Sequence, residues 1–287
     1  MNNALDIKGL RKDFNDFSIN DISLSLPTGY IMGLVGKNGA GKTTTIRLIL
    51  NMLARDGGSI KVFGLDNIVE EAKIKQDIAV VFDEMYFVDT WKIPDVEKAL
   101  KGFYVNWNSK LFNQYIKKFH LSTKKQVKEL SRGMKMKLQL AVAMSHDAKL
   151  LILDEPTSGL DPVARDELIG IFGEYISDGQ RSILFSTHIT TDLQKIADFI
   201  TLIKKGNIFF TGTKDDFLES FCLVKGGPNE LPDVLREKMI GLTTNRTGFE
   251  GLLPSSEIKY LPKELVAETP SIDEILVYIS KGEETYE

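Results

Sequence analysis

The chain has 287 residues, a formal net charge of −4 at neutral pH and 43% hydrophobic residues, enough apolar material for one large domain or a domain with an appendix. Its single cysteine, Cys222, excludes a disulfide framework, and three histidines argue against zinc chemistry. The negative charge disfavours a broad nucleic-acid surface, and no apolar run reaches the roughly 18 residues of a membrane helix. These bounds indicate a cytosolic protein.

Short apolar runs and helical stretches alternate through the first 212 residues. Residues 18–26 alternate polar and apolar side chains, as a half-buried strand does. A helix is predicted over 43–53. Buried strands are predicted for the continuous apolar runs at 30–35, 78–82, 150–153, 182–185 and 200–203. This alternation predicts an α/β fold with a parallel sheet.

Two stretches depart from that pattern. Residues 90–148 are lysine-rich and helical in pattern, which predicts a helical insertion, with the helical subdomain at about 84–148. Residues 213–287 carry 15 acidic against 8 basic residues and five of the nine prolines. We therefore expect one domain over 1–212 and a separate C-terminal extension over 213–287.

A phosphate-binding loop is predicted at residues 36–43, which read GKNGAGKT and match G-x-x-x-x-G-K-[ST] between a strand and a helix. Glycines let the backbone N–H groups wrap phosphates, and the helix start adds partial positive charge. Lys42 is expected to contact the β- and γ-phosphates and Thr43 to ligate Mg²⁺. A glycine-rich turn beside a core strand is the structural alternative. The predicted nucleotide-binding residues are Gly36, Lys37, Asn38, Gly39, Ala40, Gly41, Lys42, Thr43 and Thr44.

Acidic residues and a histidine follow two of the predicted strands. Residues 150–156 read LLILDEP, so Asp154 can hold Mg²⁺ and Glu155 can orient or deprotonate an attacking water. Residues 185–188 read FSTH, and His188 can donate to the γ-phosphate or hold the water. The alternatives are surface charges at a strand end and a structural histidine. We predict Glu155, His188 and Lys42 as catalytic residues.

A second anion site is predicted where residues 130–134 read LSRGM. Ser131 can cap a helix there, and a capped helix N-terminus attracts anions. Ordinary helix capping is the alternative, and the position before the LLILDEP strand gives the motif its weight. Residues 158–161 read SGLD, just after the acidic pair.

The order GKNGAGKT, LSRGM, LLILDEP, SGLD and FSTH, over about residues 4–212, resembles the ATP-binding subunit of ATP-binding-cassette (ABC) transporters. The resemblance implies a P-loop ABC ATPase core with an antiparallel β subdomain, and an activity that uses ATP and Mg²⁺. It implies that Phe14 stacks on adenine, with Phe17 as the second candidate. It also puts Asp83 where most members have a glutamine that reaches toward Mg²⁺, with Glu84 as the alternative if the register shifts by one.

The resemblance further implies two facing ATP-binding subunits, identical or paralogous, that work with a separate transmembrane permease at the cytoplasmic face of the membrane. The net negative charge separately argues against a nucleic-acid partner. Residues 158–161 would cross between the two sites. Arg132 and Met134 depart from the usual glycine and glutamine. The signature residues expected to close the partner's ATP are Ser131, Arg132, Gly133 and Met134.

The run VVFDE, the LSRGM motif and the segment after residue 212 resemble ATPases of bacterial exporters that handle antimicrobial or amphipathic peptides, such as phenol-soluble modulins. The resemblance also suggests permease docking at an aromatic group, for which ordinary core packing is the alternative. For the C-terminal extension, the alternative is a dimer-stabilising or purely structural appendix. Two further alternatives are a regulatory cassette and a non-transport ATPase on ribosomes or DNA. The aromatic group comprises Met85, Tyr86, Phe87, Val88 and Trp91.

Overall fold

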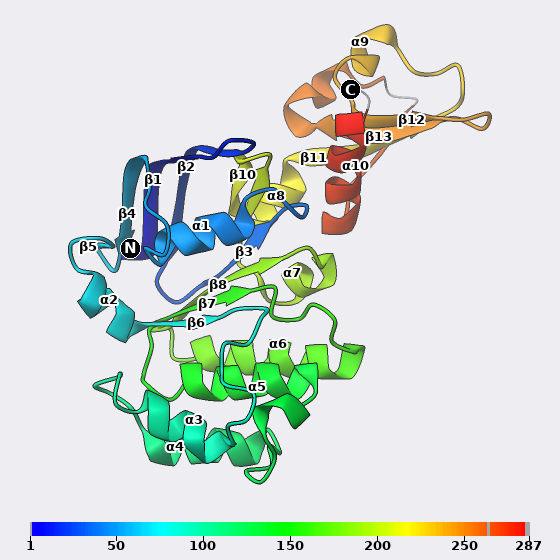
Figure 1. The fold of residues 1–287 in the computed structure, drawn as a ribbon. Helices are drawn as coiled ribbons and strands as arrows, with labels where there is room; N and C mark the ends of the chain where they lie inside the picture. The colour runs from blue at the N-terminus through cyan, green and yellow to red at the C-terminus, as the bar shows by residue number, and fades with distance from the viewer. Residues whose placement is uncertain (1, 263–264, 285–287) are drawn as a thin grey trace. The chain divides into compact units, whose positions relative to one another are not determined.

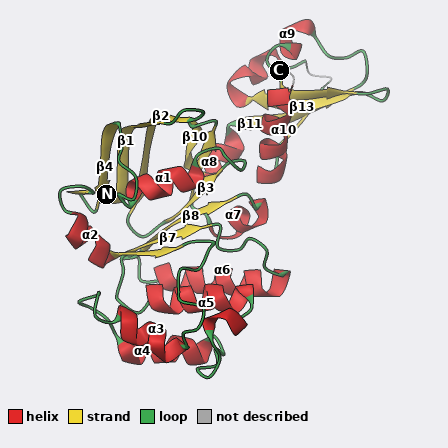
Figure 2. Ribbon diagram, in the orientation of Figure 1, coloured by secondary structure: helices red, strands yellow, loops and turns green. Residues whose placement is uncertain are grey.

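The computed structural model describes residues 2–262 and 265–284 and divides into two compact units, Met1–Thr211 and Gly212–Glu287. Figure 1 shows the fold, and Figure 2 distinguishes its helices from its strands. In the described ranges, no helix has both the length and the hydrophobicity of a transmembrane span.

An antiparallel sheet of order β2-β1-β4-β5 begins the first unit. The alternation seen in the sequence places Ile22, Leu24 and Leu26 of β2 inside, while the residues between them face solvent. Sequence periodicity identified only β2, because β1 and β4 have weaker alternation. The strands are β1 (Asn3–Asp13), β2 (Ser18–Pro27), β4 (Gly57–Val62) and β5 (Leu65–Asp66).

The six-stranded sheet of order β10-β9-β3-β8-β7-β6 forms the centre of the first unit. Pairs β9–β3, β3–β8, β8–β7 and β7–β6 are parallel, and β3, β7 and β8 are buried along their whole length. All five predicted buried strands are therefore present. Their bounds are β3 (Ile31–Val35), β6 (Ile78–Val81), β7 (Leu150–Asp154), β8 (Ser182–Thr187), β9 (Phe199–Lys204) and β10 (Asn207–Thr213).

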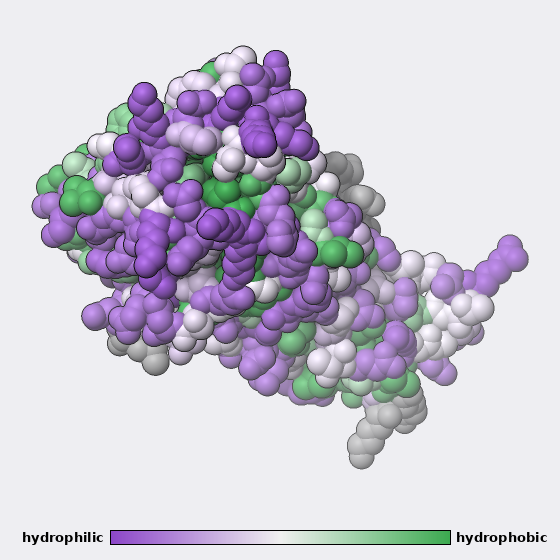
Figure 3. All heavy atoms as spheres, turned by 90° about the horizontal axis from the view of Figure 1, so that it is seen from below, coloured by the Kyte–Doolittle hydropathy of each residue, from purple (hydrophilic) through white to green (hydrophobic). Residues whose placement is uncertain are grey.

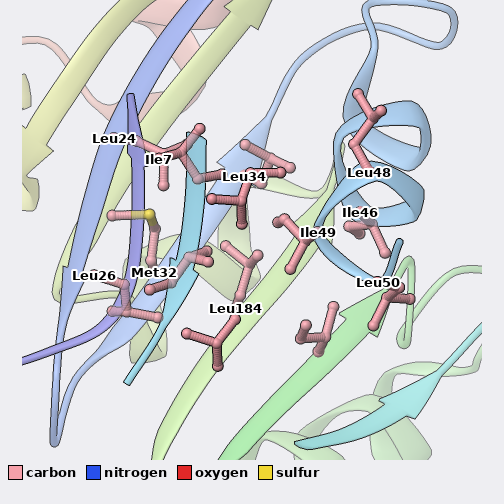
Figure 4. Close-up of a cluster of buried hydrophobic side chains, with 14 of the residues drawn as sticks. Ile7, Leu24, Leu26, Met32, Leu34, Ile46, Leu48, Ile49, Leu50 and Leu184 are labelled. Carbon is pink, nitrogen blue, oxygen red and sulfur yellow. The ribbon is translucent and has the colours of Figure 1, made fainter. Parts of the chain in front are cut away.

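Helix α1 (Lys42–Ile49) packs into the core that joins the two sheets of this unit. In Figure 4, Ile46 and Ile49 of α1 point toward Leu34 and Leu184 of the central strands. The predicted extension of the helix to residue 53 is wrong. The chain turns away because Asn51 adopts a left-handed conformation with φ of 54°, which asparagine tolerates better than most residues.

Helices cover the other side of the central sheet, where Figure 1 shows α5 and α6 below the strands and α3 and α4 beyond them. Residues 90–148, all of which the structure describes, contain no strand apart from an isolated bridge between Lys92 and Gln126. The remaining helices of the first unit are α2 (Glu71–Asp77), α3 (Ile93–Leu100), α4 (Ser109–Lys118), η1 (Val127–Glu129), α5 (Arg132–Ala143), α6 (Pro162–Ile176) and α7 (Thr190–Ile196).

The second unit is built on an antiparallel sheet of order β12-β13-β11-β14. Its small core includes Cys222, Val224, Phe249 and Leu253. The only cysteine is thus a buried packing residue whose thiol pKa is raised by burial. The elements are α8 (Lys214–Glu219), β11 (Phe221–Gly226), α9 (Asp233–Arg236), β12 (Ile240–Thr244), β13 (Phe249–Pro254), η2 (Ser255–Tyr260), β14 (Val266–Glu268) and α10 (Ile272–Glu284).

Candidate functional site

Three groups of predicted site residues lie at the carboxyl ends of the neighbouring strands β3, β8 and β7. In the parallel register, Val35 of β3 lies opposite Thr187 of β8, and Asp154 of β7 lies opposite Ser186 of β8. The phosphate loop after β3, the acidic pair at the end of β7 and His188 after β8 therefore meet at one edge of the sheet. That edge is where open α/β sheets bind their ligands.

The phosphate loop has the backbone that its glycines predict. Gly39 and Gly41 have φ of 81° and 114°, backbone angles that residues other than glycine rarely adopt. A Cβ atom on Gly41 would also lie 2.7 Å from Cδ1 of Ile19. Helix α1 begins at Lys42, so its unpaired N–H groups and positive dipole end lie directly after the loop.

Lys42 is 6% exposed and is held inside the loop. Its ammonium group donates to the carbonyl oxygen of Gly36 at 2.7 Å and lies 3.3 Å from Oε1 of Glu155. That oxygen has no hydrogen-bond partner among the described residues, so this charge contact is the one it makes there. A phosphate group that reaches Lys42 would compete directly with Glu155.

Thr43, Asp154 and Ser186 form a polar group beside Lys42. The Thr43 hydroxyl donates to Asp154 Oδ2 at 2.9 Å, and the Ser186 hydroxyl donates to Asp154 Oδ1 at 2.6 Å. Asp154 is 6% exposed, so these hydroxyls offset the desolvation of its carboxylate. The sequence did not assign Ser186 a role, although it lies within FSTH.

The donors at this point fit Mg²⁺, which prefers hard oxygen ligands and completes its shell with phosphate oxygens and waters. The structure offers the Thr43 hydroxyl and the Asp154 carboxylate side by side. In residues 2–262 and 265–284, no three His, Cys, Asp or Glu side chains form a metal cluster, and a nucleotide-bound Mg²⁺ needs only one or two protein ligands.

Glu155 and His188 contact each other across the ends of β7 and β8. Nδ1 of His188 lies 2.7 Å from Oε2 of Glu155. Glu155 has φ of 50°, and its backbone N–H donates to the Ser186 hydroxyl at 3.0 Å, which fixes the turn that carries the carboxylate. Such an arrangement, a carboxylate held by a histidine close to the phosphate loop, can accept a proton from water.

Phe14 lies in the turn between β1 and β2, where residues 12–17 line a shallow hollow. It is 43% exposed, its ring centroid is 6.4 Å from that of Phe17, and Lys12 Nζ lies 5.6 Å from the ring centre. An open aromatic face can stack on a nucleotide base. Of the two candidates, Phe14 presents the more exposed ring.

Ser131 caps helix α5 as predicted, because its side chain accepts a hydrogen bond from the Met134 N–H at 3.3 Å. In the first turn of α5, which the structure describes throughout, there is no acidic residue to neutralise the helix dipole. The turn between β7 and α6 lies close to this helix start, since a Cβ on Gly133 would be 3.5 Å from Cδ2 of Leu160.

The contact that the structure gives Asp83 is an ion pair with Arg132, which joins the loop after β6 to the first residue of α5. The sequence showed both residues as departures from the family pattern but did not pair them. The proposed proximity of Asp83 to Mg²⁺ stays a prediction, as does the alternative Glu84, which is exposed in the same loop.

Comparison with known proteins agrees with this geometry. A family model described as ABC transporter matches residues 19–158. The lantibiotic transport ATP-binding protein SrtF of Streptococcus pyogenes is 32% identical over 217 residues, which cover 71% of this chain and 88% of SrtF. The chain belongs to the ABC transporter family. It is an ABC-type ATPase, and the predicted binding and hydrolysis of ATP agree with this membership.

Two further ABC relatives extend the comparison. The Nod factor export ATP-binding protein I of Rhizobium sp. (strain N33) is 30% identical over 259 residues, which cover 81% of this chain and 80% of that protein. A solved ATP-binding subunit of an ABC transporter superposes with a TM-score of 0.68 at 24% identity and covers 74% of this chain and 91% of that one. The predicted fold class is confirmed. ABC ATP-binding subunits work with a membrane permease and usually dimerise.

Proposed function

We propose that this protein hydrolyses MgATP to drive export through a separate permease, with Glu155 as the general base. The observation that carries the proposal is that Glu155 lies between Lys42, at 3.3 Å, and His188, at 2.7 Å. The Glu155 carboxylate thus contacts both Lys42, the phosphate-binding cation, and His188, whose ring can orient the carboxylate.

The chemistry follows from these contacts. An incoming γ-phosphate binds the Lys42 ammonium group in place of Glu155. Oε1 of Glu155 is then free to accept a hydrogen bond from water. Glu155 then takes the proton as the water oxygen attacks the γ-phosphorus and the bond to the β-phosphate oxygen breaks, which yields ADP and phosphate. Mg²⁺ held by Thr43 and Asp154 would neutralise phosphate charge. Phe14 is proposed to stack on the adenine.

Each site is completed by a second ATP-binding subunit. Ser131 and Gly133 stand at the start of α5, a 12-residue helix whose N-terminal N–H groups and dipole suit a γ-phosphate. The phosphate loop binds the nucleotide from one side only, so the second helix N-terminus closes the other. The same chain supplies both motifs, which supports a homodimer and also permits a paralogous partner.

The permease is proposed to insert a short cytoplasmic segment beside the loop after β6. A groove of about 480 Å³ lies there and is lined by both acidic and basic residues around Met85 and Met136. Tyr86 follows Met85 in the chain and is 68% exposed, and such an aromatic anchor is typical of interfaces. Figure 3 views the molecule from below, where hydrophilic residues surround small hydrophobic areas. This docking would hold the protein at the cytoplasmic face of the membrane.

The cargo is proposed to be an amphipathic or antimicrobial peptide, such as a phenol-soluble modulin. The Rhizobium relative supports an exporter, because it is named for Nod factor export, and SrtF, named for lantibiotic transport, supports an antimicrobial cargo. The permease, not this chain, would contact the peptide. Candidate peptides should therefore stimulate ATP hydrolysis by this subunit when it is assembled with the permease, and should not stimulate the isolated subunit.

The hydrolysis proposal is tested by Glu155→Gln, which keeps the size of the side chain and removes the base. We expect ATP binding to persist while turnover falls by about 10²- to 10⁴-fold, and a nucleotide-bound dimer to accumulate. Phosphate release and light scattering measure the two effects. Unchanged hydrolysis would remove Glu155 from this role, and a strictly monomeric ATP-bound variant would contradict the shared site.

The docking proposal is tested by the double substitution Tyr86→Ala with Phe87→Ala. Copurification with the permease and peptide-stimulated hydrolysis should be lost, while hydrolysis by the isolated subunit stays near normal. Loss of folding or of basal hydrolysis would instead show that these rings belong to the core of the helical subdomain.

A further inference from the structure

Two of the three residues that depart from the family pattern, Asp83 and Arg132, contact each other. Their ion pair joins positions 49 residues apart in the sequence. Asp83 follows β6, and Arg132 is the first residue of α5, directly between Ser131 and Gly133. An acidic residue near a triphosphate and a cation at a helix N-terminus are each electrostatically unfavourable alone, and together they cancel.

The same guanidinium group contacts a third segment. A Cβ atom added to Gly159 would lie 2.7 Å from Nη1 of Arg132 and 3.0 Å from its Cζ. Gly159 belongs to the turn after β7 that also carries Glu155, and its φ of 67° favours glycine. Arg132, the first residue of α5, therefore lies against both the loop after β6 and the turn that follows β7.

We propose that Arg132 and Asp83 are a positioning pair for ATP hydrolysis, which ties these three segments together so that the partner-facing helix start and the water-activating turn close as one unit. The inference rests on the proposed function, because it concerns the same site. Arg132 acts here through Ser131, Gly133 and the Glu155 turn rather than by touching the nucleotide of its own chain.

Stability alone does not account for the pair. The side chains of Arg132 and Asp83 are 49% and 44% exposed, and ion pairs with this much exposure add little to folding. Both residues also line the 480 Å³ groove proposed for the permease, so a segment docked there meets the pair directly. The position suits a link between docking and catalysis better than it suits a structural clamp.

The test compares four variants of the full chain with MgATP as the only ligand: Asp83→Asn, Arg132→Gln, both together, and Arg132→Lys. Each of the first two should lower kcat by about tenfold with KM changed by less than about twofold, since coupled contacts commonly contribute this much. The double variant should be no worse than the slower single variant. Arg132→Lys keeps the charge and should recover part of the rate, while the thermal unfolding midpoint stays constant.

The matched control is Lys118 with Glu174, an ion pair between α4 and α6 with side chains 48% and 66% exposed. Lys118→Gln and Glu174→Gln should leave hydrolysis unchanged. The inference is overturned if the single variants match the parent, if their losses multiply in the double variant, if the control pair slows hydrolysis equally, or if the rate falls only with the unfolding midpoint. A parent chain that hydrolyses no MgATP would overturn the proposed function and this inference with it.

Discussion

Nδ1 of His188 lies 2.7 Å from Oε2 of Glu155, although the two residues follow different strands. A carboxylate is an acceptor only, so the ring donates from Nδ1, and in a neutral ring Nε2 is left as an acceptor. An acceptor at Nε2 suits a hydrogen bond from water better than contact with a phosphate oxygen. Of the two roles predicted for His188, the geometry favours holding the water, and the contact with Glu155 adds a role that the sequence did not suggest.

Replacing His188 with alanine should therefore slow turnover without preventing nucleotide binding. We expect kcat to fall by about a hundredfold, with little change in KM, because the base loses its orientation but the phosphate loop is intact. Steady-state phosphate release measures both constants. The exposed His120 provides the control, since His120→Ala should leave them unchanged. Equal rates for the His188 variant and the parent would assign the histidine a structural role.

The Thr43 hydroxyl should set the response to Mg²⁺. Thr43→Ala removes the group that bonds Asp154 at 2.9 Å, and we expect the Mg²⁺ concentration for half-maximal hydrolysis to rise by about tenfold or more. Thr43→Ser keeps the hydroxyl and should behave like the parent. Titration of ATP hydrolysis with Mg²⁺ distinguishes them, and identical curves for alanine and threonine would exclude the hydroxyl from the metal site.

Gly41→Ala should damage the phosphate loop. The backbone has φ of 114°, and the new Cβ would lie 2.7 Å from Ile19, so we expect a destabilisation of about 1–3 kcal/mol and weaker ATP binding. Gly170→Ala is the matched control, because Gly170 lies within α6 and, apart from its chain neighbours and the backbone of its own helix, no heavy atom lies within 4 Å of the added Cβ. That control should stabilise the protein by about 0.5–1 kcal/mol. Chemical unfolding and nucleotide titration measure these effects.

Stability should fall on mild acidification because of His146. Burial lowers the pKa of His146 below its ordinary value of 6.5, although carbonyl oxygens of Ile78 and Val142 near the ring partly oppose the shift. Between pH 6.5 and the lowered pKa, the unfolded chain binds a proton that the folded chain does not. The free energy of unfolding should then fall by up to about 1.4 kcal/mol for each unit of pH.

The measurement is denaturant unfolding of the parent and of His146→Gln at pH values above and within that window. The variant should be less stable near neutrality, since the ring of His146 stacks on Tyr104 at 3.8 Å, but its loss on acidification should be smaller. His120→Ala should keep the full loss. An equal pH slope for parent and His146→Gln would assign the acid sensitivity to other groups.

Much of the site was predictable because its motifs are contiguous in the chain. Residues 36–43 require positive φ at glycines and a helix start directly after them, and both requirements are local. Ser131 was predictable as a cap for the same reason, since it bonds the N–H only three residues ahead. The length of α1 was not, because Asn51 ends the helix through a backbone conformation that the apolar pattern does not encode.

By itself, the sequence determined the phosphate loop, the buried strands and the α/β class, because hydrophobic periodicity and glycine conformations act over a few residues. Only the tertiary structure decided which side chains meet. Thr43 reaches Asp154 across 111 positions because strand order places β7 near β3, and Arg132 reaches Asp83 across 49 because α5 starts beside the loop after β6. Such contacts depend on strand order and helix packing, which come from the burial of the whole core and not from any one segment.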